Sequence, residues 1–296
     1  MSQTGRLLFV HAHPDDETIG TGIAMAHYAK AGHQVTLITC TLGEEGEVLV
    51  PDLADLASAK NDGLGAHRAG ELAKAMSILG IDDHRRLGGD GRFRDSGMMG
   101  TEQNAREDCF WQADLTQAAT EMAAVIRQTR PHVLVTYDDF GGYGHPDHIQ
   151  AHRVAMYSAL LSAAPSFKPD LGDAWEIPKI YWTAFPRSNV ERSRRILAEQ
   201  GIDFFANDEP EGGAPWACPD EWVTTTIQDV SLEPIKVKAL LAHETQITKE
   251  APFLRISEVV GPEGLGTEHF RLVRGNLGPV QGDPARESDL LAGLSL

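Results

Sequence analysis

Two short and nearly identical motifs constrain this chain more than any other feature. HPDD at 13–16 follows the apolar run LLFV at 7–10, and HPDH at 145–148 follows the run VLVTY at 133–137 through a glycine-rich turn. Such runs are typical of buried strands in a parallel sheet, and proline is suited to the first position of a helix. Each motif therefore marks a strand-to-helix junction, where open α/β sheets bind their ligands. If the two strands are neighbours, the motifs meet in space.

The sequence between and around the two motifs alternates between strand and helix patterns. Periodicity and turn residues predict further strands at 34–41 and 84–87, and helices at 18–31, 62–79, 113–129 and 148–161. This alternation predicts an α/β fold, with a Rossmann-like, mostly parallel sheet and helices on both faces, over residues 1–165.

The signal is weaker over residues 166–296, which we expect to form a smaller C-terminal α+β portion. This portion either completes the same domain or forms a small subdomain over the active site. Strands are expected at 179–185, 222–227 and 269–273, and helices at 189–199 and 232–243. A Gly/Pro-rich acidic connection is expected at 201–219, and a loose polar tail after residue 275.

Charge and cysteine content narrow the class of protein. The chain has 43 acidic and 26 basic residues in 296, for a net charge of −17, which disfavours nucleic acid and anionic membranes as partners. It has no apolar run of the roughly 20 residues that a spanning helix needs, and no signal-peptide core. Cys40, Cys109 and Cys218 have no paired spacing, which is typical of a reducing compartment. We expect a cytoplasmic protein; no pattern indicates an oligomeric state.

The residues of the two motifs are those that bind a catalytic zinc ion. The candidates are the histidines and aspartates of both motifs: His13, Asp15, Asp16, His145, Asp147 and His148. A catalytic zinc keeps three protein ligands and one open position. His13 and Asp16, three residues apart at a helix start, can reach one ion, and Asp15 then lies beside the metal as a general base. His148 is the natural third ligand, and His145 is a possible fourth. The sequence therefore does not decide between three and four protein ligands.

Such a site hydrolyses an amide or an ester. A zinc ion lowers the pKa of bound water from about 15.7 to about 7, and a carboxylate such as Asp15 takes the proton as water attacks the carbonyl carbon. His145 or Tyr143 can then stabilise the oxyanion, and Asp147 or Asp139 can orient a histidine through its second ring nitrogen.

The motifs AHPDDE and HPDH behind apolar strands resemble the zinc-dependent N-acetylglucosamine deacetylases of the LmbE/PIG-L-like family over roughly the first 160 residues. The resemblance implies one zinc ion per chain and a role for eight residues. These are His13, Asp16 and His148 as zinc ligands, Asp15 as general base, His145 and Tyr143 on the oxyanion and leaving group, and Arg68 and Asp95 on sugar or inositol hydroxyls.

Within that family, TLGEEGEV at 41–48, RDSGM at 94–98 and GGYGHPDH at 141–148 look closest to the members that deacetylate N-acetylglucosaminyl-inositol in mycothiol biosynthesis. The substrate implied is this small amino-sugar inositol. The alternatives are a mycothiol S-conjugate amidase and a more general N-acetylglucosamine deacetylase. Gly144 stands where we expect proline in the amidase and favours the deacetylase, whereas Phe140 replaces the asparagine expected in both.

Two other hypotheses compete with this one. In an amidohydrolase barrel, His11 and His13 would form a His-x-His pair at the end of the first strand, but the second motif would have no role. A sugar-binding protein without activity would not need Asp15. Otherwise His11 is expected to be a core histidine, Cys40 a small core residue, and His243 a surface residue.

Overall fold

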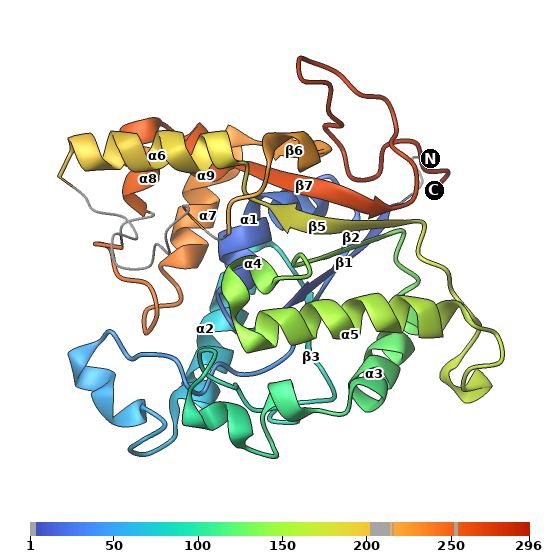
Figure 1. Ribbon diagram of the computed structural model, residues 1–296, viewed down its shortest axis with the longest axis horizontal. Helices are drawn as coiled ribbons and strands as arrows, with labels where there is room; N and C mark the ends of the chain where they lie inside the picture. Colours follow the sequence, from blue (N-terminus) through green and yellow to red (C-terminus); the bar gives the residue numbers. More distant parts are fainter. Residues whose placement is uncertain (1–3, 202–213, 215, 252–253) are drawn as a thin grey trace.

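The computed structural model describes residues 4–201, 214, 216–251 and 254–296. Its centre is a seven-stranded sheet of order β3-β2-β1-β4-β5-β7-β6 (Figure 1). The strands are β1 (Arg6–His11), β2 (Gln34–Thr39), β3 (Asp83–Arg86), β4 (Val133–Thr136), β5 (Lys179–Ala184), β6 (Thr225–Gln228) and β7 (Thr267–Arg274). The first five in this order are parallel, and β7 and β6 are added antiparallel at one edge.

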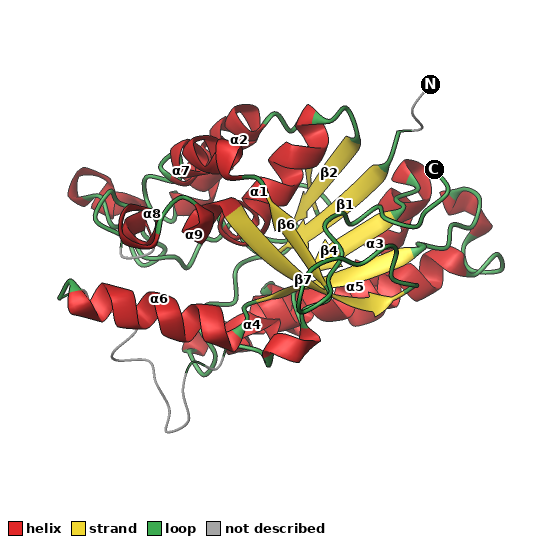
Figure 2. Cartoon of the chain, turned by 90° about the horizontal axis from the view of Figure 1, so that it is seen from above, coloured by secondary structure: helices red, strands yellow, loops and turns green. Residues whose placement is uncertain are grey.

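Helices cover both faces because successive residues of β1 point to opposite sides of the sheet (Figure 2). Leu7 and Phe9 pack with α1 (Asp16–Lys30), α2 (Leu64–Leu79) and α7 (Glu233–Leu240), whereas Leu8 and Val10 pack with α3 (Leu115–Thr129) and α5 (Pro146–Ala163). The remaining helices are α4 (Gly141–Gly144), α6 (Arg187–Glu199), α8 (Leu254–Val260) and α9 (Glu263–Gly266). Short 3₁₀ turns lie at Pro51–Leu56, Glu102–Ala105, Phe110–Gln112, Pro169–Leu171, Asp220–Trp222 and Val230–Leu232.

The pairing of β1 with β4 positions the site. Leu7, Leu8 and Phe9 pair in parallel with Val133, Leu134 and Val135, although 126 residues separate the partners. Both strands therefore end at the same edge of the sheet, and the turn that follows each one starts from this edge. The topology changes direction here, since the chain proceeds from β1 to β2 on one side and returns to β4 on the other.

The predicted α/β fold is confirmed: the sheet is mostly parallel, has the Rossmann-like order 3-2-1-4-5 and is covered on both faces. The barrel alternative is wrong, because the sheet is open. The strands of residues 166–296 join the same sheet as those of residues 1–165. Most of the acidic connection predicted at 201–219 lies outside the described residues. Among the described helices, none is long and apolar enough to cross a membrane.

The predicted loose tail after residue 275 is wrong. Leu290 and Leu291 are buried in the main core, and Glu287 is 1% exposed. Its carboxylate accepts hydrogen bonds from Lys179 Nζ at 2.7 Å, Tyr181 Oη at 2.7 Å and Thr225 Oγ1 at 2.8 Å. Local periodicity gave no sign of this packing. The segment forms no helix or strand of its own and is held by one buried carboxylate and two leucines.

We expect Glu287→Ala to destabilise the fold by about 3–5 kcal/mol, because it leaves the ammonium of Lys179 buried without its partner. The matched control is Glu176→Ala, which removes an exposed pair with Arg274 and should cost about 0–1 kcal/mol. Urea unfolding measured for both variants tests the difference. Equal losses of stability in the two variants would contradict the structural role of Glu287.

Candidate active site

The turn after β1 arranges three consecutive acidic residues in different ways. Asp16 begins α1, and its Oδ2 accepts a hydrogen bond from the backbone N–H of His13 at 2.9 Å. Asp15 is the N-cap residue and has φ 114° and ψ −34°, a conformation that costs a non-glycine residue about 1–3 kcal/mol. Glu17 Oε2 accepts a hydrogen bond from the Asp15 N–H at 2.9 Å and stabilises this backbone.

The turn after β4 places two histidines at the start of α5. His145 is the N-cap residue, and its Nδ1 accepts a hydrogen bond from the Asp147 N–H at 3.2 Å. Gly141 adopts φ +67°, and a Cβ there would lie 2.7 Å from the His148 Cβ and from the Ile149 nitrogen. Glycine is therefore required at 141 for the loop to pass close to the helix.

The structure brings the two motifs together, as the sequence predicted. The His13 ring centroid lies 4.6 Å from that of His145 and 5.3 Å from that of His148. Asp16 Oδ2 lies 3.2 Å from His13 Nδ1 and 3.3 Å from His148 Nε2. His13 and His148 are 6% and 3% exposed, so these groups converge in a buried position.

The chemistry of these groups fits a divalent metal ion. His148 Nε2 is buried and has no hydrogen-bond partner among the described residues, and a metal would satisfy its lone pair. Burial alone would raise the pKa of Asp16, but His148 and His13 hold that pKa well below its usual value, so the carboxylate is ionised. His13 Nε2 lies 3.1 Å from Asp147 Oδ2, which leaves Nδ1 directed to Asp16. A carboxylate on the second ring nitrogen is the usual support of a metal-binding histidine.

Other groupings of ligand atoms are present at and near this point. Within each of three groups the ligand atoms lie within 4.8 Å of one another: His13, His145 and His148; His13, Asp95 and Asp147; and His67, Glu71 and Glu244. In the second group both carboxylates already accept protein N–H or O–H groups. Asp147 binds the N–H and Oγ of Ser96, and Asp95 binds the N–H groups of Glu45 and Gly97.

Asp15 combines burial with ionic contacts. Burial raises its pKa to about 6, against the opposing charge of Arg68, while the neighbouring Asp16 adds to the increase. Arg68 Nη2 lies 3.2 Å from Asp15 Oδ2 and also donates to the Pro14 carbonyl oxygen. A carboxylate with such a pKa can accept a proton near neutral pH, as a general base must.

His145 and Tyr143 come from the turn after β4, and the rings of both lie 5.0 Å from that of His148. Burial, together with the charges of His13 and His148, lowers the pKa of His145 to about 2, so its imidazole is neutral at pH 7. Because Nδ1 accepts the Asp147 N–H, the ring proton is on Nε2, which can donate a hydrogen bond. The Tyr143 ring lies edge-on to His148 at 5.0 Å and is 45% exposed, so it borders solvent.

The two residues predicted to bind sugar hydroxyls lie at the site, but their polar atoms are largely engaged. Arg68 is buried, and its Nη1 donates to the Gly43 carbonyl oxygen at 2.7 Å. Of the three guanidinium nitrogens of Arg68, only Nε has no partner within the described residues. Asp95 is buried, with Oδ1 at 3.6 Å from His13 Nε2. Their contacts hold the loops at 43 and 97 in place, and their role toward substrate stays a prediction.

Sequence reasoning missed several residues that support the site. Tyr137, which ends the VLVTY run, contacts Asp16 and His148. His243 was expected at the surface, but it is fully buried, with Nε2 at 3.2 Å from Glu17 Oε1. The expectation for His243 was wrong because its partner is 226 residues distant in the sequence. His11, in contrast, is the predicted core histidine, hydrogen-bonded to Thr21 Oγ1 at 2.9 Å.

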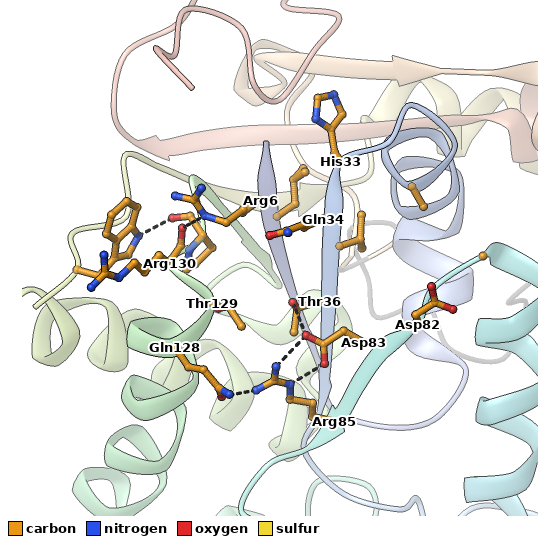
Figure 3. Close-up of a pocket in the computed structure, with 16 residues that line it drawn as sticks. Arg6, His33, Gln34, Thr36, Asp82, Asp83, Arg85, Gln128, Thr129 and Arg130 are labelled. Atoms are coloured by element: carbon orange, nitrogen blue, oxygen red, sulfur yellow. Dashed lines mark hydrogen bonds and ion pairs between the residues drawn. The ribbon is translucent and has the colours of Figure 1, made fainter. Parts of the chain in front are cut away.

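A cavity of about 810 Å³ lies at the amino ends of the strands, the edge opposite to the histidines (Figure 3). It is lined by residues such as Arg6, Gln34 and Arg130, and none of the predicted site residues lines it. Its Arg85 is bound to Asp83 and to Gln128. The predicted site residues of the two motifs lie instead after the carboxyl ends of β1 and β4.

Comparisons with known proteins agree with this geometry. Residues 8–159, which contain both motifs, match the family model described as PIG-L: GlcNAc-PI de-N-acetylase. The chain belongs to the PIG-L family. It is 53% identical to a 1D-myo-inositol 2-acetamido-2-deoxy-alpha-D-glucopyranoside deacetylase of Kribbella flavida, over 98% of each chain, and 52% identical to one of Geodermatophilus obscurus, over 99% of each chain.

Several solved structures share the fold at low sequence identity. The N,N'-diacetylchitobiose deacetylase of Pyrococcus horikoshii aligns with a TM-score of 0.62 and 19% identity, over 92% of this chain and 85% of that one. The 4-carboxy-2-hydroxymuconate hydratase of Pseudomonas putida aligns with a TM-score of 0.59 and 17% identity, over 94% and 100%. The same PIG-L fold therefore occurs in a deacetylase and in a hydratase, and the fold alone does not determine the reaction.

Proposed function

We propose that this chain is a zinc-dependent N-deacetylase that converts 1D-myo-inositol 2-acetamido-2-deoxy-α-D-glucopyranoside to acetate and glucosaminyl-inositol, the step that mycothiol biosynthesis requires. The observation that supports the reaction is the convergence of His13, Asp16 and His148 beside the partly buried carboxylate of Asp15. The substrate follows from relatives that carry this name at 52–53% identity over nearly the whole chain. Both motifs, the metal set and the general base are those of an amide hydrolase.

In this proposal His13, Asp16 and His148 hold the zinc ion. Zinc, when bound, lowers the pKa of a water ligand to about 7 and polarises the acetyl carbonyl group. A teicoplanin deacetylase of this fold has been solved in a zinc-inhibited form, so zinc acts on at least one protein of this fold, there as an inhibitor. Asp147 fixes the ring of His13 through Nε2, and its own oxygens are fixed by Ser96.

The protein's own groups then handle the protons. Asp15 accepts a proton from the attacking water as the new carbon–oxygen bond forms. His145 donates a hydrogen bond through Nε2 to the oxyanion, and Tyr143, at the solvent edge, assists there or at the leaving nitrogen. When the carbon–nitrogen bond breaks, the proton that Asp15 accepted passes to the amine nitrogen. The acetic acid so formed loses its remaining proton to solvent, and acetate and the free amine leave.

The substrate is tested with three amides: N-acetylglucosaminyl-inositol, N-acetylglucosamine and a bimane conjugate of mycothiol. We expect acetate release from the first at the highest kcat/KM, loss of activity after chelation and recovery with added zinc. Faster hydrolysis of the bimane conjugate would identify the amidase instead. Faster turnover of free N-acetylglucosamine would identify a general deacetylase, and binding without hydrolysis a sugar-binding protein.

Asp15→Asn should lower kcat by about 10²–10⁴-fold, because it removes the general base and keeps the size of the side chain. The wild-type kcat should rise with pH to a plateau above about 6, because Asp15 must be ionised to accept a proton and its pKa is raised to about 6. Below that pH each unit should cost about tenfold in rate. Acetate release measured from pH 4.5 to 8 tests both, and near wild-type activity of Asp15→Asn would contradict the role.

The ligand set is tested by zinc content after dialysis. Asp16→Ala and His148→Ala should retain less than a tenth of the zinc that the wild-type chain retains, since each removes one of three ligands. Asp95→Asn is the matched control, because Asp95 lies at the same point and its oxygens already bind backbone N–H groups. Loss of zinc from Asp95→Asn, with retention in Asp16→Ala, would assign the metal to His13, Asp95 and Asp147 instead.

A further inference from the structure

Tyr137 lies between the two motifs, directly after β4. Its side chain is 7% exposed and contacts residues of both turns. Neither the metal chemistry nor the proton transfers proposed above require a phenol at this position. Its contacts nevertheless converge on two of the proposed zinc ligands, which come from different elements, Asp16 from α1 and His148 from α5.

The hydroxyl group of Tyr137 has one hydrogen to donate, and its surroundings determine where that hydrogen goes. The oxygen accepts the backbone N–H of Ala12 at 2.9 Å, and it lies 2.8 Å from Asp16 Oδ2 and 3.3 Å from His11 Nδ1. Asp16 Oδ2 is the closer of the two acceptors, so it receives the hydrogen.

The ring of Tyr137 fixes the second ligand. It stacks on the imidazole of His148, with centroids 4.3 Å apart and planes inclined by 20°. His11, at the end of β1, packs edge-on against the same ring at 5.3 Å and 87°, so the phenol has a second aromatic contact. The orientation of His148 about its side-chain torsions is therefore restricted by an aromatic surface that is itself fixed to the sheet.

We propose that Tyr137 is a positioning residue of the metal centre, which orients Asp16 through its hydroxyl and His148 through its ring. The inference rests on the proposed function, because it takes these two residues as zinc ligands. The hydroxyl contributes to zinc binding without contacting the metal, and supporting groups of this kind are worth about 10–100-fold in metal affinity. A tyrosine that only filled the core would stabilise the fold without affecting that affinity.

The test is the zinc dissociation constant of Tyr137→Phe, measured on the full chain by competition with a chelating dye in the absence of substrate. We expect it to be about 10–100-fold weaker than for the wild-type chain. The matched control is Tyr157→Phe on α5, which removes the same atom away from the site and should bind zinc as the wild-type chain does. Acetate release by Tyr137→Phe should recover when zinc is added above its new dissociation constant.

A double-mutant cycle separates positioning from packing. If Tyr137 acts through Asp16, removal of its hydroxyl should weaken zinc binding in the wild-type background and have no further effect in the Asp16→Asn background. Tyr137→Leu, which also removes the stacked ring, should weaken zinc binding more than Tyr137→Phe. A zinc dissociation constant of Tyr137→Phe within twofold of wild type, or an equal effect in both backgrounds, would overturn the inference.

The two proposals fail in different ways. Zinc affinity is measured without substrate, so unchanged affinity in Tyr137→Phe contradicts only the positioning role. A wild-type chain that binds zinc but releases no acetate from N-acetylglucosaminyl-inositol contradicts only the proposed reaction.

Discussion

The parallel pairing of β1 with β4 is the interaction on which the rest of the site depends. In the proposed site, one turn provides His13 and Asp16 and the other provides His148, so neither turn alone would supply enough ligands for a catalytic metal. The pairing of Leu7 with Val133 fixes the two strand ends side by side, and the backbone N–H of Ala12 then reaches the hydroxyl of Tyr137. Residues 126 positions apart in the sequence become neighbours through hydrogen bonds of the sheet.

The site contains many acidic groups. It is stable because most of their carboxylates have hydrogen-bond or ionic partners. Asp147 accepts two hydrogen bonds from Ser96, Asp95 accepts backbone N–H groups, and Glu17 is paired with the buried His243. A buried carboxylate without such partners would cost several kcal/mol. Two groups stay available for chemistry. One is His148 Nε2, which has no hydrogen bond within the described residues although Asp16 Oδ2 lies 3.3 Å away, and the other is Asp15, on its strained backbone and with a pKa of about 6. The surrounding network limits the reactive groups to these few.

The sequence was sufficient to predict those parts of the fold and site whose pattern lies within a short stretch of residues. The apolar runs, the helix periodicities and the two motifs predicted the alternating fold and the meeting of His13 with His148, because each is contained in fewer than 20 residues. The supporting contacts were not predictable, since Tyr137 reads as the last residue of a strand and His243 as an ordinary polar residue after a helix. Glu287 was missed for the same reason: nothing near it in sequence reveals the buried Lys179 that it binds.

The C-terminal part contributes contacts that support the groups of the site. The segment after α7 lies against the loops around the site: His243 binds Glu17, Thr245 donates two hydrogen bonds to Glu71, and Gln246 donates to the carbonyl oxygen of Glu47. Glu17 in turn accepts a hydrogen bond from the backbone of Asp15, so a residue far along the chain constrains the proposed general base. The hydratase shares the architecture, and the chemistry is therefore set by side chains and loops rather than by the sheet. The similarity to the deacetylases covers 98–99% of the chain and so includes this segment. This coverage fits a C-terminal part that belongs to the catalytic unit.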